Sequence, residues 1–93
     1  MIFVINNLKY NTDNMTLISD KCKYTYKGNL LSCYYYAKNV KLWKSNKNNW
    51  LLTYERDFTM TCAISLTEEE AKKKLIMYDL ETYEKMYGEL EEA

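Results

Sequence analysis

The stretch that decides the fold is residues 59–70, TMTCAISLTEEE, where one hydrophobic period gives way to another. Up to Leu66 every second side chain is apolar and those between are small or polar, which predicts a strand with one buried side and one wet side. The next four residues, Thr67 to Glu70, have the spacing of a capping box. A helix is therefore predicted to begin at Glu68, directly after the strand.

The residues that follow continue this helix and add a second one. Ala71, Leu75 and Tyr78 recur at helical spacing and mark a buried stripe. Three glutamates precede three lysines by four residues, the orientation that favours ion pairs along a helix. Asp79 is suited to cap a second, short helix, and Gly88 is suited to end it. The apolar positions of this second helix are Leu80, Tyr83 and Tyr87.

Toward the N-terminus, the apolar segments alternate as strands do. Residues Ile2 to Ile5 form a short strand candidate that Asn6-Asn7 interrupts, and Tyr10 to Asn14 is dense in turn-forming side chains. A longer strand is predicted from Met15 to Tyr26. Its apolar phase slips once near Ser19-Asp20, which predicts a β-bulge.

A first hairpin is predicted around Lys27-Gly28-Asn29, and it returns the chain through a strand from Leu30 to Leu42. If the first two of these turn residues form the loop, Cys22 and Cys33 lie opposite each other. If the last two form it, they do not, and both registers remain open.

A second hairpin is predicted at the polar loop Lys44 to Asn49. Symmetry about the middle of this loop places Trp43 across from Trp50, so that the two indoles hold the hairpin together. The return strand runs to Tyr54, and Glu55-Arg56-Asp57 is predicted to turn the chain into the strand described first.

These elements predict a single α+β domain over residues 1–93. We expect an antiparallel meander sheet of four to five strands, packed on one face by the C-terminal helix and continued by the short second helix. The charge divides at the same boundary: residues 1–66 carry nine basic and four acidic side chains, and residues 67–93 carry four and nine. The formal net charge of zero thus conceals +5 on the sheet part and −5 on the helical part.

The side-chain inventory favours binding over catalysis. The sequence has no histidine, which removes the commonest general base and the commonest neutral metal ligand. Its three cysteines lack the paired spacing of zinc sites, and no glycine-rich phosphate loop is present. A carboxylate pair such as Asp57 with Glu55 is conceivable, but it has no partner group that would make it a catalytic site. We therefore expect no enzyme, no metal and no cofactor.

The same inventory predicts a compartment. An odd number of cysteines fits a reducing environment, where they serve as small buried hydrophobic residues. The apolar run Met1 to Ile5 is far too short for a membrane span or a signal-peptide core. We expect a soluble protein of the cytoplasm with no membrane contact.

Two candidate binding surfaces follow from the charge pattern. The first is a basic sheet face with its adjoining loop, in which lysines alternate with tyrosine and tryptophan. Its proposed contact residues are Lys21, Lys23, Lys41, Lys44 and Lys47. Lysine beside aromatic residues suits single-stranded nucleic acid, although the aromatic residues could equally form a tyrosine core beneath a solvated lysine face.

The second surface is an acidic strip at the C-terminal end, which reaches into a tail, Glu89 to Ala93, that we expect to fray. Its carboxylates have only Lys85 nearby, and they could steer the protein toward a basic groove that normally holds nucleic acid. The proposed contact residues are Glu81, Glu84, Glu89, Glu91 and Glu92.

The order of motifs also resembles a known group of small proteins. The motifs are Lys9-Tyr10-Asn11-Thr12-Asp13, Leu42-Trp43-Lys44, Trp50-Leu51-Leu52, Leu66-Thr67-Glu68-Glu69-Glu70-Ala71 and the terminal segment from Tyr83 to Ala93. The family occurs on phages and other mobile elements of low-GC Gram-positive bacteria, and similar small proteins include inhibitors of host CRISPR systems. Asn48 stands where the family usually has glycine and Tyr87 where it often has phenylalanine, and both changes preserve the architecture.

The resemblance implies an anti-CRISPR-type inhibitor that binds a host CRISPR effector protein and blocks it stoichiometrically. Two alternatives remain. One is a nucleic-acid-binding module that uses the basic sheet face, and binding to single strands that weakens steeply with salt would favour it. The other is a small homodimeric structural protein that pairs exposed strand edges, rather than a monomer.

Overall fold

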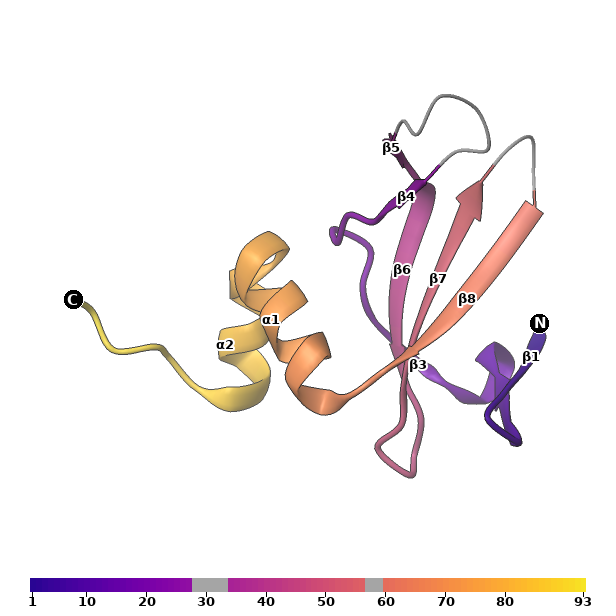
Figure 1. The fold of residues 1–93 in the computed structure, drawn as a ribbon. Helices are drawn as coiled ribbons and strands as arrows, with labels where there is room; N and C mark the ends of the chain where they lie inside the picture. The colour runs from indigo at the N-terminus through magenta and orange to yellow at the C-terminus, as the bar shows by residue number, and fades with distance from the viewer. Residues whose placement is uncertain (28–33, 57–59) are drawn as a thin grey trace.

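The computed structural model describes residues 1–27, 34–56 and 60–93, and it confirms the predicted α+β class. Within these residues, eight strands precede two helices (Figure 1). The elements are β1 (Ile2–Ile5), β2 (Leu8–Asn11), the 3-10 turn η1 (Thr12–Asn14), β3 (Thr16–Ser19), β4 (Thr25–Lys27), β5 (Tyr34–Tyr36), β6 (Lys38–Lys44), β7 (Trp50–Arg56), β8 (Met60–Leu66), α1 (Glu68–Tyr78) and α2 (Leu80–Tyr87).

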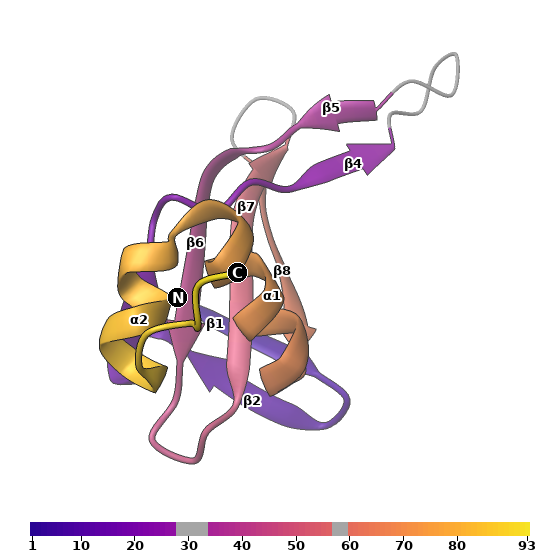
Figure 2. The same ribbon diagram turned by 90° about the vertical axis from the view of Figure 1, so that its left-hand side faces the viewer.

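A four-stranded antiparallel sheet in the order β3-β6-β7-β8 forms the centre of the molecule. Strands β6, β7 and β8 follow one another as the predicted meander, and β3 pairs with the outer side of β6. The other strands make two separate hairpins, β1–β2 and β4–β5. The helices and the β1–β2 hairpin lie on opposite faces of the central sheet, and β4–β5 projects beyond one end of it (Figures 1 and 2).

The main core lies on the helical face of the sheet. Leu42, Trp50 and Leu52 pack there with Ala71 and Leu75 of α1. All five side chains are almost completely excluded from solvent, and burying a leucine of this kind contributes roughly 2 kcal/mol. The apolar stripe of α1 is therefore what joins the helical part to the sheet.

The opposite face is also covered, which corrects one expectation. Leu51 is fully buried there, and Thr61, Ala63 and Ser65 of β8 are half-buried rather than wet. The reason is that the β1–β2 hairpin packs against β8 on this side. This hairpin turns at Asn6 and Asn7, both in the left-handed conformation with φ of 51° and 64°, as tight two-residue hairpins require.

Both long strands predicted before residue 43 are broken in the structure. The β3–β6 register shifts between Leu17 and Ser19, so the predicted bulge is present, one residue early. Residues 20–24 then leave the sheet instead of continuing the strand to Tyr26. Strands β5 and β6 separate at Ala37. The predicted turn at residues 27–29, the position of Cys33 and the Asp57 end of the last turn lie outside the described residues.

The expected pairing of the two tryptophans is wrong by one residue. Trp43 lies opposite Leu51, and Trp50 lies opposite Lys44. The connecting loop has five residues and closes with a hydrogen bond from the Ser45 amide to the Asn49 carbonyl, 2.9 Å long. A loop with an odd number of residues places the two indoles on opposite sides of the sheet. Trp50 enters the core, and Trp43 donates to the Thr53 hydroxyl at 2.9 Å on the opposite face.

The helical part forms as its local signals predict. Thr67 and Glu70 complete the capping box, with the Glu70 amide 3.1 Å from the threonine hydroxyl and the Thr67 amide 3.0 Å from the glutamate carboxylate. Asp79 caps α2, and Gly88 ends it at φ 95°. Leu80 and Tyr87 are exposed, however, and Tyr83 with Met86 face the core instead.

Candidate interaction surfaces

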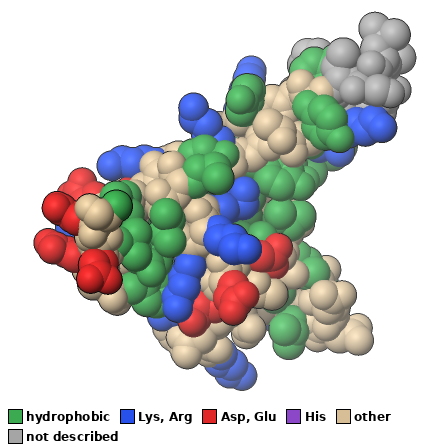
Figure 3. Space-filling model, turned by 60° about the vertical axis from the view of Figure 1, so that its left-hand side comes forward, with side chains coloured by type: hydrophobic (Ala, Val, Ile, Leu, Met, Phe, Trp, Pro, Cys, Tyr) green, Lys and Arg blue, Asp and Glu red, His purple; other side chains and the backbone are tan. Residues whose placement is uncertain are grey.

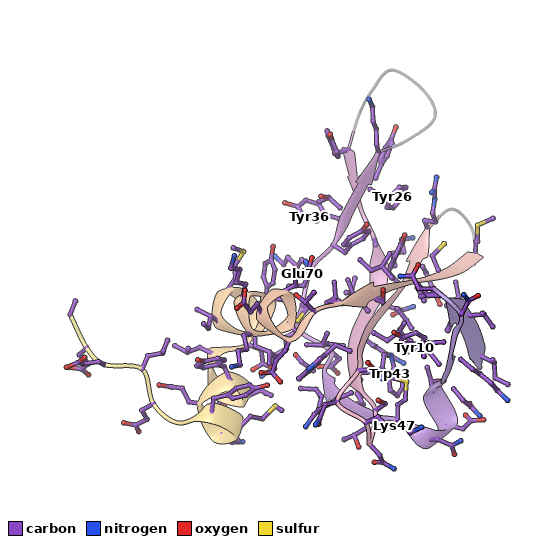
Figure 4. All side chains as sticks on the ribbon, turned by 60° about the horizontal axis from the view of Figure 1, so that its bottom comes forward. Tyr10, Tyr26, Tyr36, Trp43, Lys47 and Glu70 are labelled. Carbon is purple, nitrogen blue, oxygen red and sulfur yellow. The ribbon has the colours of Figure 1, made fainter. Side chains whose placement is uncertain are left out.

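The β4–β5 hairpin, called here the tyrosine arm, is built so that its two faces differ. Tyr26 pairs with Tyr35, and the flanking pairs Thr25 with Tyr36 and Lys27 with Tyr34 point to the other side. Figure 4 shows Tyr26 and Tyr36 on opposite sides of the hairpin. The run of three tyrosines in β5 therefore places Tyr35 on one face and its two neighbours on the other.

The first face of the tyrosine arm holds it to the central sheet. The Tyr26 and Tyr35 rings lie 6.0 Å apart, and the Arg56 guanidinium of β7 lies 4.8 Å from the centre of the Tyr26 ring. A guanidinium over a tyrosine contributes about 0.5–1 kcal/mol at an exposed site. This contact fixes the direction in which the arm leaves the sheet.

The second face of the tyrosine arm is open to solvent. Tyr34 is 71% exposed and Tyr36 is 73% exposed, beside the exposed Lys27. Large aromatic side chains are rarely left this exposed without a partner, and tyrosine is enriched where proteins bind one another. The pair is the strongest interaction signal among the described residues.

A cleft of about 420 Å³ lies at the base of the tyrosine arm, called here the basic cleft. Lys21, Lys23 and Tyr36 line it together with the buried side chains of Cys22 and Val40. Burial raises the pKa of the Cys22 thiol above its ordinary value, so this cysteine is a protonated, unreactive part of the lining.

Lys74 of α1 contacts the segment that supplies Lys21 and Lys23 to the basic cleft. Its ammonium lies 3.5 Å from the Lys23 carbonyl oxygen and 5.6 Å from the centre of the Tyr24 ring. Tyr24 in turn stacks on Tyr54 of the central sheet at 4.5 Å. The irregular segment 20–24 is therefore held between the helix and the sheet, which fixes Lys21 and Lys23 beside the arm.

The five lysines predicted to lie together on a basic sheet face and its adjoining loop are not brought together in the structure. Lys21 and Lys23 lie outside the strands, at the basic cleft. Lys41 pairs with Thr53 and Lys44 with Trp50, on opposite sides of β6, because the two lysines are three positions apart in a structure of period two. The Lys44 ammonium lies 6.0 Å from the centre of the Trp50 ring.

Lys47 is separate again, at the far end of the sheet from the tyrosine arm. It lines a hollow of about 510 Å³ between the 45–49 loop and the β1–β2 hairpin, where Tyr10 and Lys9 also lie. Figure 4 shows Lys47 and Tyr36 at opposite ends of the molecule. A single ligand of modest size therefore does not contact all five lysines.

The acidic strip does form one region. Glu81 and Glu84 lie on α2, and the other three predicted residues lie in the exposed tail that follows. Figure 3 shows a group of acidic side chains at this end of the molecule, with basic side chains between it and the tyrosine arm. Glu81 pairs with Lys85 at 3.1 Å, and Glu84 accepts from the Leu90 amide at 3.3 Å.

Asp79 attaches this acidic end to the sheet. Its carboxylate accepts from the Ser19 hydroxyl at 2.6 Å and from the Thr82 hydroxyl at 2.8 Å, and the group is buried. Burial opposes ionisation, but these hydrogen bonds and the nearby Lys21 outweigh it and hold the pKa of Asp79 below its ordinary value. The acidic helical part is therefore joined to the basic sheet part by a buried hydrogen bond between Asp79 and Ser19.

The sequence pattern predicts that the tyrosines form a core or alternate with lysines on a basic face, and it does not distinguish Tyr34 and Tyr36 from the others. The signal that could have distinguished them is their adjacency, since consecutive residues of a strand cannot all face one core. Between residues 1 and 93, outside the gaps at 28–33 and 57–59, no group of three His, Cys, Asp or Glu side chains is placed to hold a metal ion.

Comparison with protein-family models, curated proteins and solved structures finds no match for this chain. Neither α1 nor α2, the helices in the described part of the chain, is long and apolar enough to cross a membrane.

Proposed function

We propose that this protein is an anti-CRISPR-type inhibitor that binds a host CRISPR effector protein and blocks it stoichiometrically, without turnover. The observation that carries the proposal is the solvent-exposed pair Tyr34 and Tyr36 on a projecting arm. Tyrosine provides a large contact area for little conformational entropy, since it has only two rotatable side-chain bonds. Two such rings on a hairpin anchored by Arg56 form a ready-made binding element.

The acidic end adds the specificity for a nucleic-acid-handling target. Glu81, Glu84 and the tail glutamates form an unbalanced negative region, and Lys85 is the basic residue that pairs within it. A groove built to hold nucleic acid is lined with lysine and arginine, and such a region attracts carboxylates through the same field. The inhibitor would act in the cytoplasm of the bacterial host, where the effector is found.

A pull-down from a lysate of a CRISPR-bearing low-GC Gram-positive host tests the binding step. The baits are the wild-type chain, Tyr34→Ala/Tyr36→Ala and Glu81→Lys/Glu84→Lys/Glu89→Lys, with retained proteins identified by mass spectrometry. Met77→Ala is the matched control, because Met77 is also 71% exposed but lies on α1. We expect the wild type and the control to retain a Cas protein and both multiple variants to lose it. If the wild type retains none, the proposal fails.

A titration of the purified effector tests the mode of action. Stoichiometric blockade predicts that nuclease activity falls linearly and ends at a fixed ratio of inhibitor to effector, independent of incubation time. Inhibition by substoichiometric amounts that deepens with time would instead show turnover and contradict the proposal.

A second candidate function is single-stranded nucleic-acid binding, and one observation favours it. Tyr36 lines the same cleft as Lys21 and Lys23, so that an exposed ring lies beside two ammonium groups. Fluorescence anisotropy with a labelled oligonucleotide separates the two functions. Binding at about 0.15 M salt that weakens steeply as salt rises would favour nucleic acid over a protein target.

A further inference from the structure

The basic cleft and the acidic tail have matching chemistry. The cleft presents Lys21 and Lys23 around an apolar lining that includes Cys22, Ala37 and Val40, in a volume of about 420 Å³. Asp20 is the one acidic residue among the described residues that line it. A complementary ligand would therefore be an acidic peptide with one apolar side chain among its carboxylates.

The tail of this same chain has that composition. Residues 89–93 read ELEEA, so Leu90 stands between Glu89 and the pair Glu91-Glu92. The tail has no helix or strand, all of its residues are exposed, and Leu90 is 44% exposed. In Figure 1 it leaves α2 on the side of the helices that faces away from the central sheet.

Charge favours a second copy of the chain as the source of this peptide. The molecule has a formal net charge of zero, with +5 in residues 1–66 and −5 in residues 67–93. Two copies therefore have no net repulsion to overcome, and the end of one copy attracts the opposite end of the other. In Figure 1 the tail extends away from β6, which supplies Asn39 and Val40 to the cleft, and this direction also favours contact between copies over contact within one.

We propose that two copies associate by exchanging tails, each placing its acidic tail in the basic cleft of the other. Leu90 of one copy packs against Cys22, Ala37 and Val40 of the other, and its flanking glutamates pair with Lys21 and Lys23. The exchange is reciprocal and closes at a dimer with two identical contacts. This inference does not rest on the proposed inhibitor function.

Sedimentation velocity of the full-length chain tests the proposal. Because the contacts are largely exposed ion pairs, we expect the dissociation constant to rise about tenfold between about 0.05 M and about 0.5 M salt. Leu90→Ala should weaken the dimer without changing any charge, and Met77→Ala should leave it unchanged. A wild-type chain that stays monomeric at low salt and high concentration would overturn the proposal.

A charge exchange makes the test specific to these two surfaces. The tail variant Glu89→Lys/Glu91→Lys/Glu92→Lys and the cleft variant Lys21→Glu/Lys23→Glu should each be monomeric alone. Their equimolar mixture should dimerise, because the lysine tail then meets the glutamate cleft with reversed signs while the unaltered tail meets the unaltered cleft. This recovery also shows that both variants are folded. A mixture that stays monomeric, or a tail variant that still dimerises through strand edges, would refute the exchange.

Discussion

Tyrosines of the central sheet and tyrosines of the arm have opposite environments. Tyr54 is 8% exposed and stacks on Tyr24, and burial raises its pKa to about 12. Tyr34 and Tyr36 are 71% and 73% exposed on a hairpin whose two strands, in the described part of the chain, pair with each other and not with the central sheet. Tyrosine is therefore a core residue in one region and a surface residue in the other, and the difference follows from how many faces of each strand are covered.

Strand β7 explains the stabilising half of the comparison. It has the helices on one face and the β1–β2 hairpin on the other, so Leu51, Leu52 and Tyr54 are all buried. Neither the helices nor the β1–β2 hairpin covers strand β5. Substitutions in the sheet and helix layer should therefore reduce stability, whereas substitutions on the outer face of the tyrosine arm should not.

The largest effect is expected for Leu75→Ala. Leu75 is fully buried between α1 and the sheet, and its truncation removes apolar contacts and leaves a cavity. We expect a loss of about 2–5 kcal/mol in the free energy of unfolding, measured by urea denaturation. Leu90→Ala is the matched control and should change stability by less than about 0.5 kcal/mol. Equal losses in the two variants would show that the helices do not pack as described.

Asp79→Ala is expected to come next, because Asp79 joins the helical part to β3. The substitution removes the cap of α2 and leaves the Ser19 and Thr82 hydroxyls without their buried acceptor. We expect a loss of about 2–3 kcal/mol. Asp79→Asn should lose less, since asparagine is also a good helix cap. If Asp79→Ala is as stable as the wild type, this buried contact does not hold the helical part to the sheet.

The same carboxylate makes stability depend on pH. The pKa of Asp79 is lowered in the folded state, so its ionised form stabilises the protein above the unfolded-state value of about 3.9. This stabilisation is lost as the pH falls through the folded-state pKa. The difference in unfolding free energy between wild type and Asp79→Asn should therefore shrink from pH 7 to about pH 3. A difference that stays constant would exclude Asp79 as the group responsible.

A smaller effect is expected for the capping box. Thr67→Ala removes the hydroxyl that accepts from the Glu70 amide, and we expect it to cost about 1 kcal/mol. Thr25→Ala is its counterpart on the tyrosine arm, an exposed threonine with no cap to lose. Thermal unfolding should show a larger loss of stability for Thr67→Ala than for Thr25→Ala. A larger loss for Thr25→Ala would contradict the assignment of Thr25 as an exposed residue that contributes little to stability.

Features set by local rules were predictable from the sequence. The capping box at Thr67, the cap at Asp79 and the end of α2 at Gly88 each depend on residues a few positions apart, and all three are present. The strand alternation of residues 60–66 was also readable, and it gave the correct fold class. These signals need no knowledge of what packs against them.

Features set by tertiary contacts were not predictable in the same way. The Trp43 pairing failed because it depends on whether the connecting loop has an even or odd number of residues. The break at residues 20–24 depends on Lys74 and the Tyr24–Tyr54 stack, which are distant in sequence. The opposite faces of Lys41 and Lys44, by contrast, follow from their spacing alone.

The smallest effect on stability is expected on the tyrosine arm. Tyr34→Ala/Tyr36→Ala should change the free energy of unfolding by no more than about 0.5 kcal/mol, because both rings already face solvent. Tyr54→Ala in the sheet should cost about 3 kcal/mol, since it removes a buried ring. Urea denaturation of both variants measures this difference directly.

Partner binding by Tyr34→Ala/Tyr36→Ala shows whether the two exposed rings act in recognition. If it keeps the stability of the wild type but no longer retains a partner, the two rings act in recognition alone. If it loses more than about 1.5 kcal/mol, the rings pack against part of the protein, and the arm belongs with the core that Tyr54 represents. Tyr34→Phe/Tyr36→Phe then separates ring area from hydroxyl hydrogen bonding, because it keeps the aromatic surface and removes only the polar atoms.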